Sequence, residues 1–187
     1  MEKIALFGTS ADPPTAGHKA ILQWLAQHYD RVAVWVSDNP FKEHRTARQN
    51  REAMLRLIIN ELSNCSRVSL HEELSDRRSL HSVQKAQEIW GEEVEYVFVI
   101  GSDLAGQIRQ WYQVEQLLQQ VRLLIVPRPG SPVQESDLNA LRLLGASYEV
   151  ANIEVPAVSS TAYREEGNQD ALTLSVQDYI RQEQLYS

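Results

Sequence analysis

The stretch from Ile4 to His18, IALFGTSADPPTAGH, constrains the fold more than any other part of the chain. It opens with a short apolar run, which is too short for a helix and long enough for a buried strand. Gly8 interrupts this run, and Asp12-Pro13-Pro14 can neither continue a strand nor lie inside a helix. After Gly17 apolar residues return at helical spacing. The stretch therefore predicts a strand, a tight turn and a helix.

A turn that leads into a helix is suited to bind phosphate, because the first N–H groups of the helix are unpaired and its N-terminus carries a partial positive charge. Gly17 has no Cβ, so a phosphate could approach the backbone there. Thr15 and His18 are three residues apart and project from neighbouring positions of the first turn. A lone His in a turn is most often an exposed helix residue, but Thr15 and the glycines beside His18 favour an anion site.

The rest of the chain alternates strands with helices. Apolar runs predict strands at 32–36, 68–70, 96–100, 123–126 and 153–155, and helical spacing is found over 48–62, 80–90, 114–120, 137–144 and 172–180. This alternation predicts an α/β fold, a Rossmann-like doubly wound parallel sheet covered on both faces. We expect residues 1–187 to form a single domain, because too little chain follows the Pro- and Gly-containing loop 128–132 for a second core.

Composition excludes several classes of protein. The formal net charge of −7 argues against a general nucleic-acid binder, which needs a basic face. No apolar run approaches the roughly 18 residues of a membrane helix, and the chain enters its first strand without a signal-peptide core. The single Cys65 permits neither an internal disulfide nor a cysteine metal cluster, and no fixed metal site is expected. We expect a cytoplasmic protein with no nucleic-acid or membrane partner; the sequence leaves a homo-oligomer open.

A second candidate site follows the predicted strand at 153–155. Ser159, Ser160 and Thr161 can cap a helix, which is the ordinary role of such residues. Ser160 and Arg164 are four residues apart and share a helix face. An Arg near a helix N-terminus is unfavourable for the helix dipole, and a bound polyphosphate would resolve that conflict. The pattern favours a phosphate-binding role over capping alone.

Candidate ligand-binding residues also follow the central apolar run at 96–100. Gly101 and Asp103 come directly after it, where a carboxylate can accept hydrogen bonds from ribose hydroxyls, although a helix N-cap explains Asp103 equally well. Trp111 and Tyr112 come next. Paired aromatic residues usually belong to a core, but a planar heteroaromatic ligand needs such a stacking surface.

A basic stretch follows the second predicted strand. Lys42, Arg45, Arg48 and Arg51 gather there in a chain that is acidic overall. On a helix face these residues would ordinarily be solvated, and near a phosphate site they would help to hold anionic substrates. Both interpretations stay open.

The two candidate sites carry a family resemblance. The opening stretch resembles the signature G-x-x-x-D-P-x-[HT]-x-G-H of the nucleotidyltransferase superfamily, through Gly8, Asp12, Pro13, Thr15, Gly17 and His18. Residues 158–164 resemble the second motif of that superfamily, I-S-S-T-x-I-R, with Val158 and Tyr163 as departures. The resemblance runs from Ile4 to Arg164 and is to the nicotinate-nucleotide adenylyltransferases.

Members of that family transfer AMP from ATP to nicotinate mononucleotide, giving deamido-NAD and pyrophosphate in NAD biosynthesis. The resemblance implies catalytic roles for His18 and Arg164, and a Mg²⁺ ion that accompanies ATP. It implies that ATP is bound by Gly8, Thr9, Ser10, Thr15, Gly17, His18, Gly101, Asp103, Ser159, Ser160, Thr161 and Arg164. It implies that the pyridine mononucleotide is bound by Asn39, Lys42, His44, Trp111 and Tyr112, with Trp111 stacked on the pyridine ring.

Three departures leave alternatives open. Thr15 stands where this family usually has a His, and Thr there is familiar from the phosphopantetheine adenylyltransferases. Ala11 replaces a usual Phe, and Ser79-Leu80-His81 matches the S-Y-T element of the family only loosely. Nicotinamide mononucleotide and phosphopantetheine therefore remain alternative acceptors. A non-catalytic nucleotide-binding module of the same fold is an alternative from another class, against which the retention of both His18 and Arg164 argues.

Overall fold

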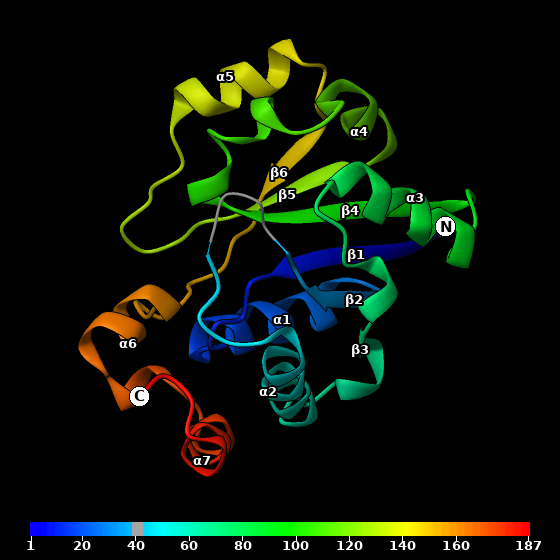
Figure 1. Ribbon diagram of the computed structural model, residues 1–187. Helices are drawn as coiled ribbons and strands as arrows, with labels where there is room; N and C mark the ends of the chain where they lie inside the picture. The colour runs from blue at the N-terminus through cyan, green and yellow to red at the C-terminus, as the bar shows by residue number, and fades with distance from the viewer. Residues whose placement is uncertain (39–42) are drawn as a thin grey trace.

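A computed structural model describes residues 1–38 and 43–187 and contains one six-stranded parallel sheet (Figure 1). The strand order is β3-β2-β1-β4-β5-β6, and every neighbouring pair is parallel. The strands are β1 (Glu2–Thr9), β2 (Arg31–Val36), β3 (Val68–Leu70), β4 (Val94–Gly101), β5 (Arg122–Val126) and β6 (Tyr148–Val150). This order confirms the expected doubly wound, Rossmann-like fold.

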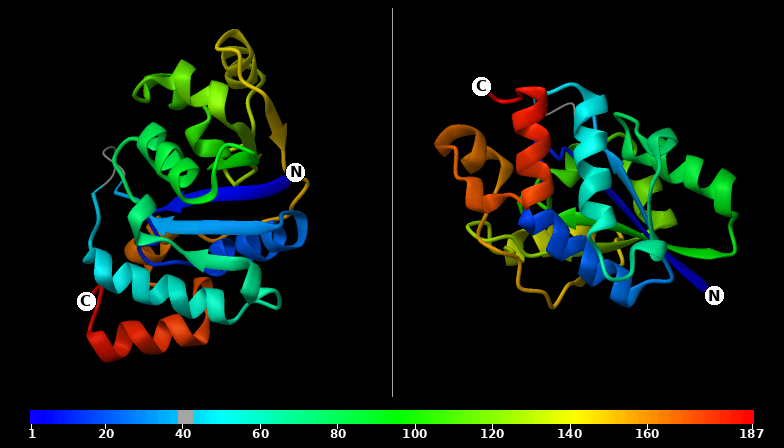
Figure 2. Two further views of the ribbon diagram at one scale, coloured as in Figure 1. Left: turned by 90° about the vertical axis from the view of Figure 1, so that its right-hand side faces the viewer. Right: turned by 90° about the horizontal axis from the view of Figure 1, so that it is seen from below.

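Helices cover both faces of the sheet (Figure 2). On one face lie α1 (Ala16–His28), α2 (Arg48–Asn60), α6 (Ser160–Glu166) and α7 (Leu174–Glu183). On the other lie α3 (Ser79–Trp90), α4 (Val114–Gln120) and α5 (Glu135–Leu143). Within the described residues, no helix combines the length and the apolar character needed to cross a bilayer.

Two hydrophobic cores follow from the alternation of side chains along the strands. On β1, Ala5 and Phe7 face the core under α1 and α2, whereas Ile4 and Leu6 face the core under α3 and α4. The central strands are apolar on both faces, as a sheet buried on both sides requires. This explains why the continuous run at 96–100 marked a central strand.

Most predicted elements are present, but the strand expected at 153–155 is wrong. The sixth strand is Tyr148–Val150, and its partner β5 ends at Val126, immediately before Pro127, which has no N–H to extend the ladder. The apolar residues Ile153 and Val155 instead pack against the core that contains α1. Their alternation signalled burial correctly and pairing incorrectly.

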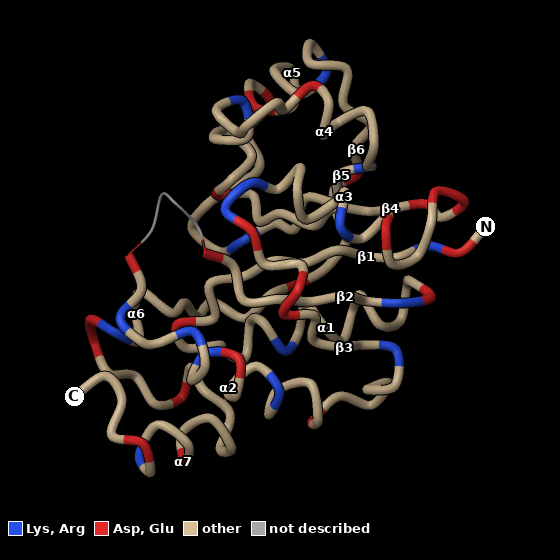
Figure 3. Tube along the Cα trace, turned by 45° about the vertical axis from the view of Figure 1, so that its right-hand side comes forward, with Lys and Arg blue, Asp and Glu red and all other residues tan. Residues whose placement is uncertain are grey.

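The centre of the sheet also fixes where a ligand can bind. β1 and β4 are neighbours, and the chain runs outward from β1 through β2 and β3 on one side and from β4 through β5 and β6 on the other. The loops after β1 and β4 therefore diverge and leave a crevice at the carboxyl ends of these strands. Figure 3 shows charged residues of both signs at strand ends, in helices and in loops, with the central strands largely uncharged.

Gly8 does not end the first strand, which continues to Thr9. Its lack of a side chain is required by Trp35 on the neighbouring β2, because a Cβ at position 8 would lie 2.7 Å from the indole Nε1. Trp35 is itself buried, with an exposed fraction of 3%. The glycine thus lets the indole lie across β1 at the edge of the crevice.

The Gly8→Ala variant is expected to lose about 1–3 kcal/mol of unfolding free energy, because the new methyl group overpacks the core against Trp35. Urea unfolding measures the loss. The double variant Gly8→Ala/Trp35→Phe has room for the methyl group and is expected to lose less than the sum of the single variants. Additive losses would show that the indole does not impose the glycine.

Candidate active site

The turn after β1 is closed by a capping box at the start of α1. Thr15 is the N-cap, and its hydroxyl accepts a hydrogen bond from the Gly17 N–H at 3.1 Å. The Thr15 N–H donates to Nδ1 of His18 at 2.9 Å, and the Thr15 hydroxyl is 3.1 Å from the same nitrogen. The pair expected from the sequence is therefore real, but an imidazole takes the place that a carboxylate or amide usually has in such a box.

This contact fixes the tautomer of His18. Because the backbone N–H of Thr15 donates to Nδ1, that nitrogen cannot carry a proton, and the proton of the neutral ring lies on Nε2. Thr15 and His18 are both buried, with exposed fractions of 1% and 8%. The ring is thus held as a directed hydrogen-bond donor at the N-terminus of α1.

The second motif contacts the first. The Ser160 hydroxyl donates to the Pro13 carbonyl at 2.6 Å, and Nη1 of Arg164 donates to the Asp12 carbonyl at 2.6 Å. Ser159 caps α6 by accepting from the Ala162 N–H at 3.0 Å. The two stretches that the sequence singled out therefore form one site, although they are far apart along the chain.

The expected conflict between Arg164 and the dipole of its helix does not exist. Helix α6 ends at Glu166 and has only 7 residues, so Arg164 lies in its last turn, where a cation is favourable. The sequence argument from the dipole was wrong, whereas the shared face of Ser160 and Arg164 is confirmed by their common contact with the loop.

Both motifs line a polar cavity of about 400 Å³. Across it, Nη1 of Arg128 lies 3.9 Å from a carboxylate oxygen of Asp103. Most of the residues expected to bind ATP are in its wall, namely Thr9, Ser10, His18, Asp103, Ser159, Ser160, Thr161 and Arg164. His44 lines the same cavity. The combination of hydroxyls, guanidinium groups and a helix N-terminus suits a polyphosphate.

A second cavity, of about 540 Å³, is aromatic. Trp111 and Tyr112 line it, as expected, together with Trp35 and Phe98. Trp111 is partly buried and meets the Phe98 ring edge-on at 6.0 Å. Trp111 therefore packs against the core and also lines the cavity, and its stacking on a ligand stays a prediction.

A small cavity of about 70 Å³ joins the other two. It shares Gly8, Ser37, Ile100 and Leu104 with the aromatic cavity. It shares Thr9, Ser10, His18 and Asp103 with the polar cavity. His18 and the start of α1 thus lie where a ligand in one cavity would meet a ligand in the other.

Gly17 and Gly101, the other two glycines of the candidate site, serve the protein's own packing. A Cβ on Gly17 would lie 3.2 Å from the Thr15 hydroxyl oxygen and 3.4 Å from Cγ1 of Val155, so the glycine avoids close contacts within the chain itself. A Cβ on Gly101 would lie 2.9 Å from Cδ of Arg128. Both glycines nevertheless line the joining cavity, together with Thr15.

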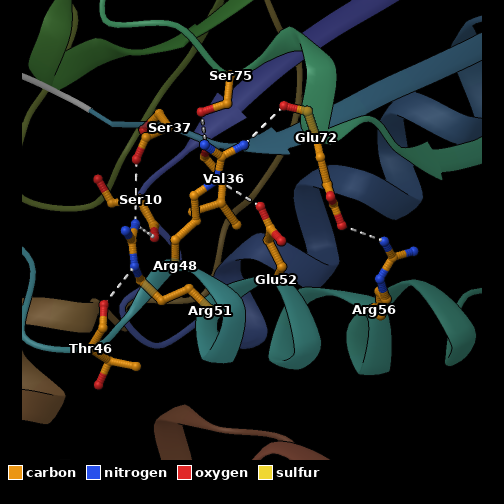
Figure 4. A network of polar contacts seen from close by, with 10 residues as sticks. All are labelled: Ser10, Val36, Ser37, Thr46, Arg48, Arg51, Glu52, Arg56, Glu72 and Ser75. Atoms are coloured by element: carbon orange, nitrogen blue, oxygen red, sulfur yellow. Dashed lines mark hydrogen bonds and ion pairs between the residues drawn. The ribbon is translucent and has the colours of Figure 1, made fainter.

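Two cations of the basic stretch, Arg48 and Arg51, are engaged by the protein itself. Arg48 pairs with Glu52 at 2.8 Å, and the buried guanidinium of Arg51 donates to the carbonyls of Ser10, Ser37 and Thr46 (Figure 4). Burial lowers the pKa of Arg51, which nevertheless remains a cation at neutral pH. Asn39 and Lys42 lie outside the described residues.

Sequence reasoning missed the cations beside the aromatic cavity. Arg77 and Arg78 line it just before α3, and the Arg78 guanidinium lies 4.2 Å from the centroid of the Tyr112 ring. Arg128 was treated only as part of a loop. The signal available for the first pair was two consecutive Arg residues directly before a helical pattern, in a sequence with no other two adjacent Lys or Arg residues.

Comparisons with known proteins agree with this geometry. The cytidylyltransferase-like family model matches residues 6–166. A probable nicotinate-nucleotide adenylyltransferase from Synechocystis sp. is 48% identical, with 98% of each chain covered. A protein of the same description from Bacillus cereus is 28% identical, covering 100% of this chain and 99% of its own.

Solved structures share the fold. The Plasmodium falciparum nicotinic acid mononucleotide adenylyltransferase complexed with NaAD superposes with a TM-score of 0.84 at 22% identity, covering 100% of this chain and 98% of its own. The same enzyme complexed with APC gives 0.81 at the same identity and coverage. With a full-length relative at 48% identity and a matching family model, the chain belongs to the nicotinate-nucleotide adenylyltransferase family of cytidylyltransferase-like proteins.

Proposed function

We propose that the protein transfers the adenylyl group of ATP to nicotinate mononucleotide, giving deamido-NAD and pyrophosphate. The observation that carries this proposal is the placement of His18 between a polar cavity and an aromatic cavity. A polyphosphate in the first and a planar ring in the second would bring two phosphate groups together beside the imidazole. Family membership supports the same reaction.

The reaction requires alignment more than proton transfer. The 5′-phosphate of the mononucleotide attacks the α-phosphorus of ATP, a new P–O bond forms, and the bond to the β-phosphate breaks to release pyrophosphate. The attacking phosphate is largely ionised at neutral pH, because its second pKa is about 6, so no protein base is needed. Alignment and stabilisation of the charge on the transferred group are then the main sources of catalysis.

Several groups of the polar cavity have a role in this scheme. Nε2–H of His18 and the N-terminus of α1 face the α-phosphate, where charge develops in the transition state. Arg164, with Ser159, Ser160 and Thr161, holds the β- and γ-phosphates. Asp103, at the edge of the same cavity, accepts hydrogen bonds from the ribose hydroxyls.

A Mg²⁺ ion would accompany ATP rather than occupy a site built by the protein. Within residues 1–38 and 43–187, no three His, Cys, Asp or Glu side chains are grouped to hold a metal. Both carboxylate oxygens of Asp12 already accept hydrogen bonds from Arg45 and Tyr186. Mg²⁺ that bridges phosphates keeps several waters and needs no such cage, so the residues present fit this use of the ion.

The aromatic cavity favours the acid over the amide as acceptor. Trp111 offers a stacking surface for the pyridine ring, and Arg77 and Arg78 place positive charge at the same cavity. Asp38 and Asp76 line the same cavity, and a nicotinate carboxylate would give the two Arg residues a further anionic partner that a nicotinamide cannot supply. The substrates are soluble nucleotides, and we infer that the protein acts on them in the cytoplasm.

The first test supplies ATP with nicotinate mononucleotide, nicotinamide mononucleotide or phosphopantetheine and measures pyrophosphate release. We predict the largest kcat/KM for the acid, by roughly 100-fold over the amide if unpaired polar groups penalise the wrong ligand. Preference for the amide would overturn the substrate assignment, and preference for phosphopantetheine would make Thr15 the better guide. Release with none of the three would leave a nucleotide-binding module.

The variant Trp111→Ala separates the two cavities in the same assay. We expect it to raise KM for the pyridine substrate and to leave the affinity for ATP unchanged, since Trp111 lines only the aromatic cavity. An equal loss of ATP affinity would mean that Trp111 acts through the core and not through stacking.

The His18→Ala variant is expected to lower kcat by roughly 100- to 1000-fold, the scale found for removal of one preorganised transition-state donor. Affinity for ATP should fall much less, because the other phosphate-binding groups remain. His28→Ala is the matched control, because His28 is an exposed residue near the end of the same helix. Near-normal turnover of His18→Ala would remove the imidazole from the mechanism.

A further inference from the structure

The loop between β1 and α1 is held from behind by a buried carboxylate. Asp12 is 1% exposed, and its two oxygens accept different hydrogen bonds. The Arg45 N–H donates to Oδ2 at 2.7 Å, and the Tyr186 hydroxyl donates to Oδ1 at 2.6 Å. Tyr186 follows α7, and Figure 2 shows this end of the chain beside the segment that leads into α2.

A buried cation stands next to the same loop. Arg51, on α2, is 4% exposed, and it donates to the Ser10 carbonyl at 3.0 Å and to the Thr46 carbonyl at 2.9 Å. It also donates to the Ser37 carbonyl at the end of β2 at 3.3 Å. Figure 4 shows this side chain reaching these segments from its helix. Burial lowers the pKa of Arg51, and the neighbouring Asp12 acts in the opposite direction.

The loop needs such support because its backbone is strained. Ala11 has φ of 48°, in the left-handed region that a residue with a Cβ rarely adopts. A conformation of this kind persists only where the surroundings over-determine it. Here the neighbours on both sides of Ala11 are fixed, Ser10 by Arg51 and Asp12 by Arg45, Tyr186 and Arg164.

We propose that Tyr186 and Arg51 are positioning residues for adenylyl transfer, which hold the loop 10–15 so that His18 faces the junction of the two cavities. This inference rests on the proposed function for the reaction that it serves. Neither residue lines any of the three cavities described above, so neither contacts a ligand in them. They act on the site through the backbone of Ser10 and Ser37 and the carboxylate of Asp12.

The Tyr186 phenol keeps its proton under the conditions of the reaction. Burial, and then the hydrogen bond to Asp12, raise the pKa of this phenol above its usual value. It therefore stays a hydrogen-bond donor to Oδ1 of Asp12 throughout the neutral range. Removal of the hydroxyl leaves one buried oxygen of Asp12 without its donor.

The variant pair Tyr186→Phe and Tyr179→Phe tests the proposal. The Tyr179 hydroxyl, on α7, donates to Oδ1 of Asn50 on α2 at 2.9 Å, so its loss removes one phenol hydrogen bond near the same end of the chain without touching the loop. We expect Tyr186→Phe to lower kcat by roughly 10- to 100-fold, the scale of a small misalignment of reacting groups. KM for ATP should be unchanged, and Tyr179→Phe should keep the wild-type kcat.

Thermal unfolding of both variants separates positioning from stability. A lower kcat for Tyr186→Phe beside the wild-type kcat of Tyr179→Phe, at equal shifts in Tm, supports the proposal. Equal kcat values for the two variants would overturn it. It would also be overturned if Tyr186→Phe kept full activity at temperatures where the protein is folded and lost activity only where the protein is partly unfolded.

Hydrogen exchange keeps this test independent of the reaction. The Arg45 amide donates directly to Asp12, so it should exchange faster in Tyr186→Phe than in Tyr179→Phe if the phenol holds that carboxylate. Equal exchange rates of the Arg45 amide in the two variants would overturn the proposal that the Tyr186 hydroxyl holds Asp12. If the wild-type protein adenylylates no acceptor but the exchange rates differ as expected, the proposed function is wrong. The support of the loop by the hydrogen bond from Tyr186 to Asp12 is then still confirmed.

Discussion

The hydrogen bond from the Thr15 backbone N–H to Nδ1 of His18 is the contact on which the site depends. It ends the turn, starts α1 and sets the orientation of the imidazole at once. The parallel sheet supplies the place, because β1 and β4 are adjacent and their following loops diverge. The capping contact turns that place into a directed donor at the positive end of a helix.

An acidic protein can still bind polyphosphate, because the charge that matters is local. The chain has a net charge of −7, yet Arg128, Arg164 and the N-terminus of α1 converge on the polar cavity. Arg77 and Arg78 bring positive charge to the aromatic cavity. Arg48 and Arg51 instead serve the framework, one in an ion pair and the other bonded to main-chain carbonyls.

The sequence determined the fold and the two motifs because those features are local. Strand β1, the cap at Thr15 and the helix α1 follow from apolar spacing, two prolines and a glycine within the first 28 residues. The features that the sequence did not predict depend on contacts between segments that are far apart along the chain. No periodicity says that β5 pairs with residues 148–150 and not with 153–155, that Val155 lies beside Gly17, or that Trp35 crosses Gly8. The hydroxyl of Tyr186 reaches Asp12 across 174 positions of sequence, which no local pattern encodes.

The imidazole of His18 is a neutral hydrogen-bond donor with its proton on Nε2, and Thr15 holds it in place. Nitrogen NMR of the imidazole in ¹⁵N-histidine-labelled protein, with His18→Gln used to assign the signal, tests it most directly. Because the Thr15 N–H donates to Nδ1, we predict that at neutral pH Nδ1 is unprotonated and Nε2 carries the proton. A ring protonated on Nδ1, as the other tautomer or as imidazolium, would contradict it.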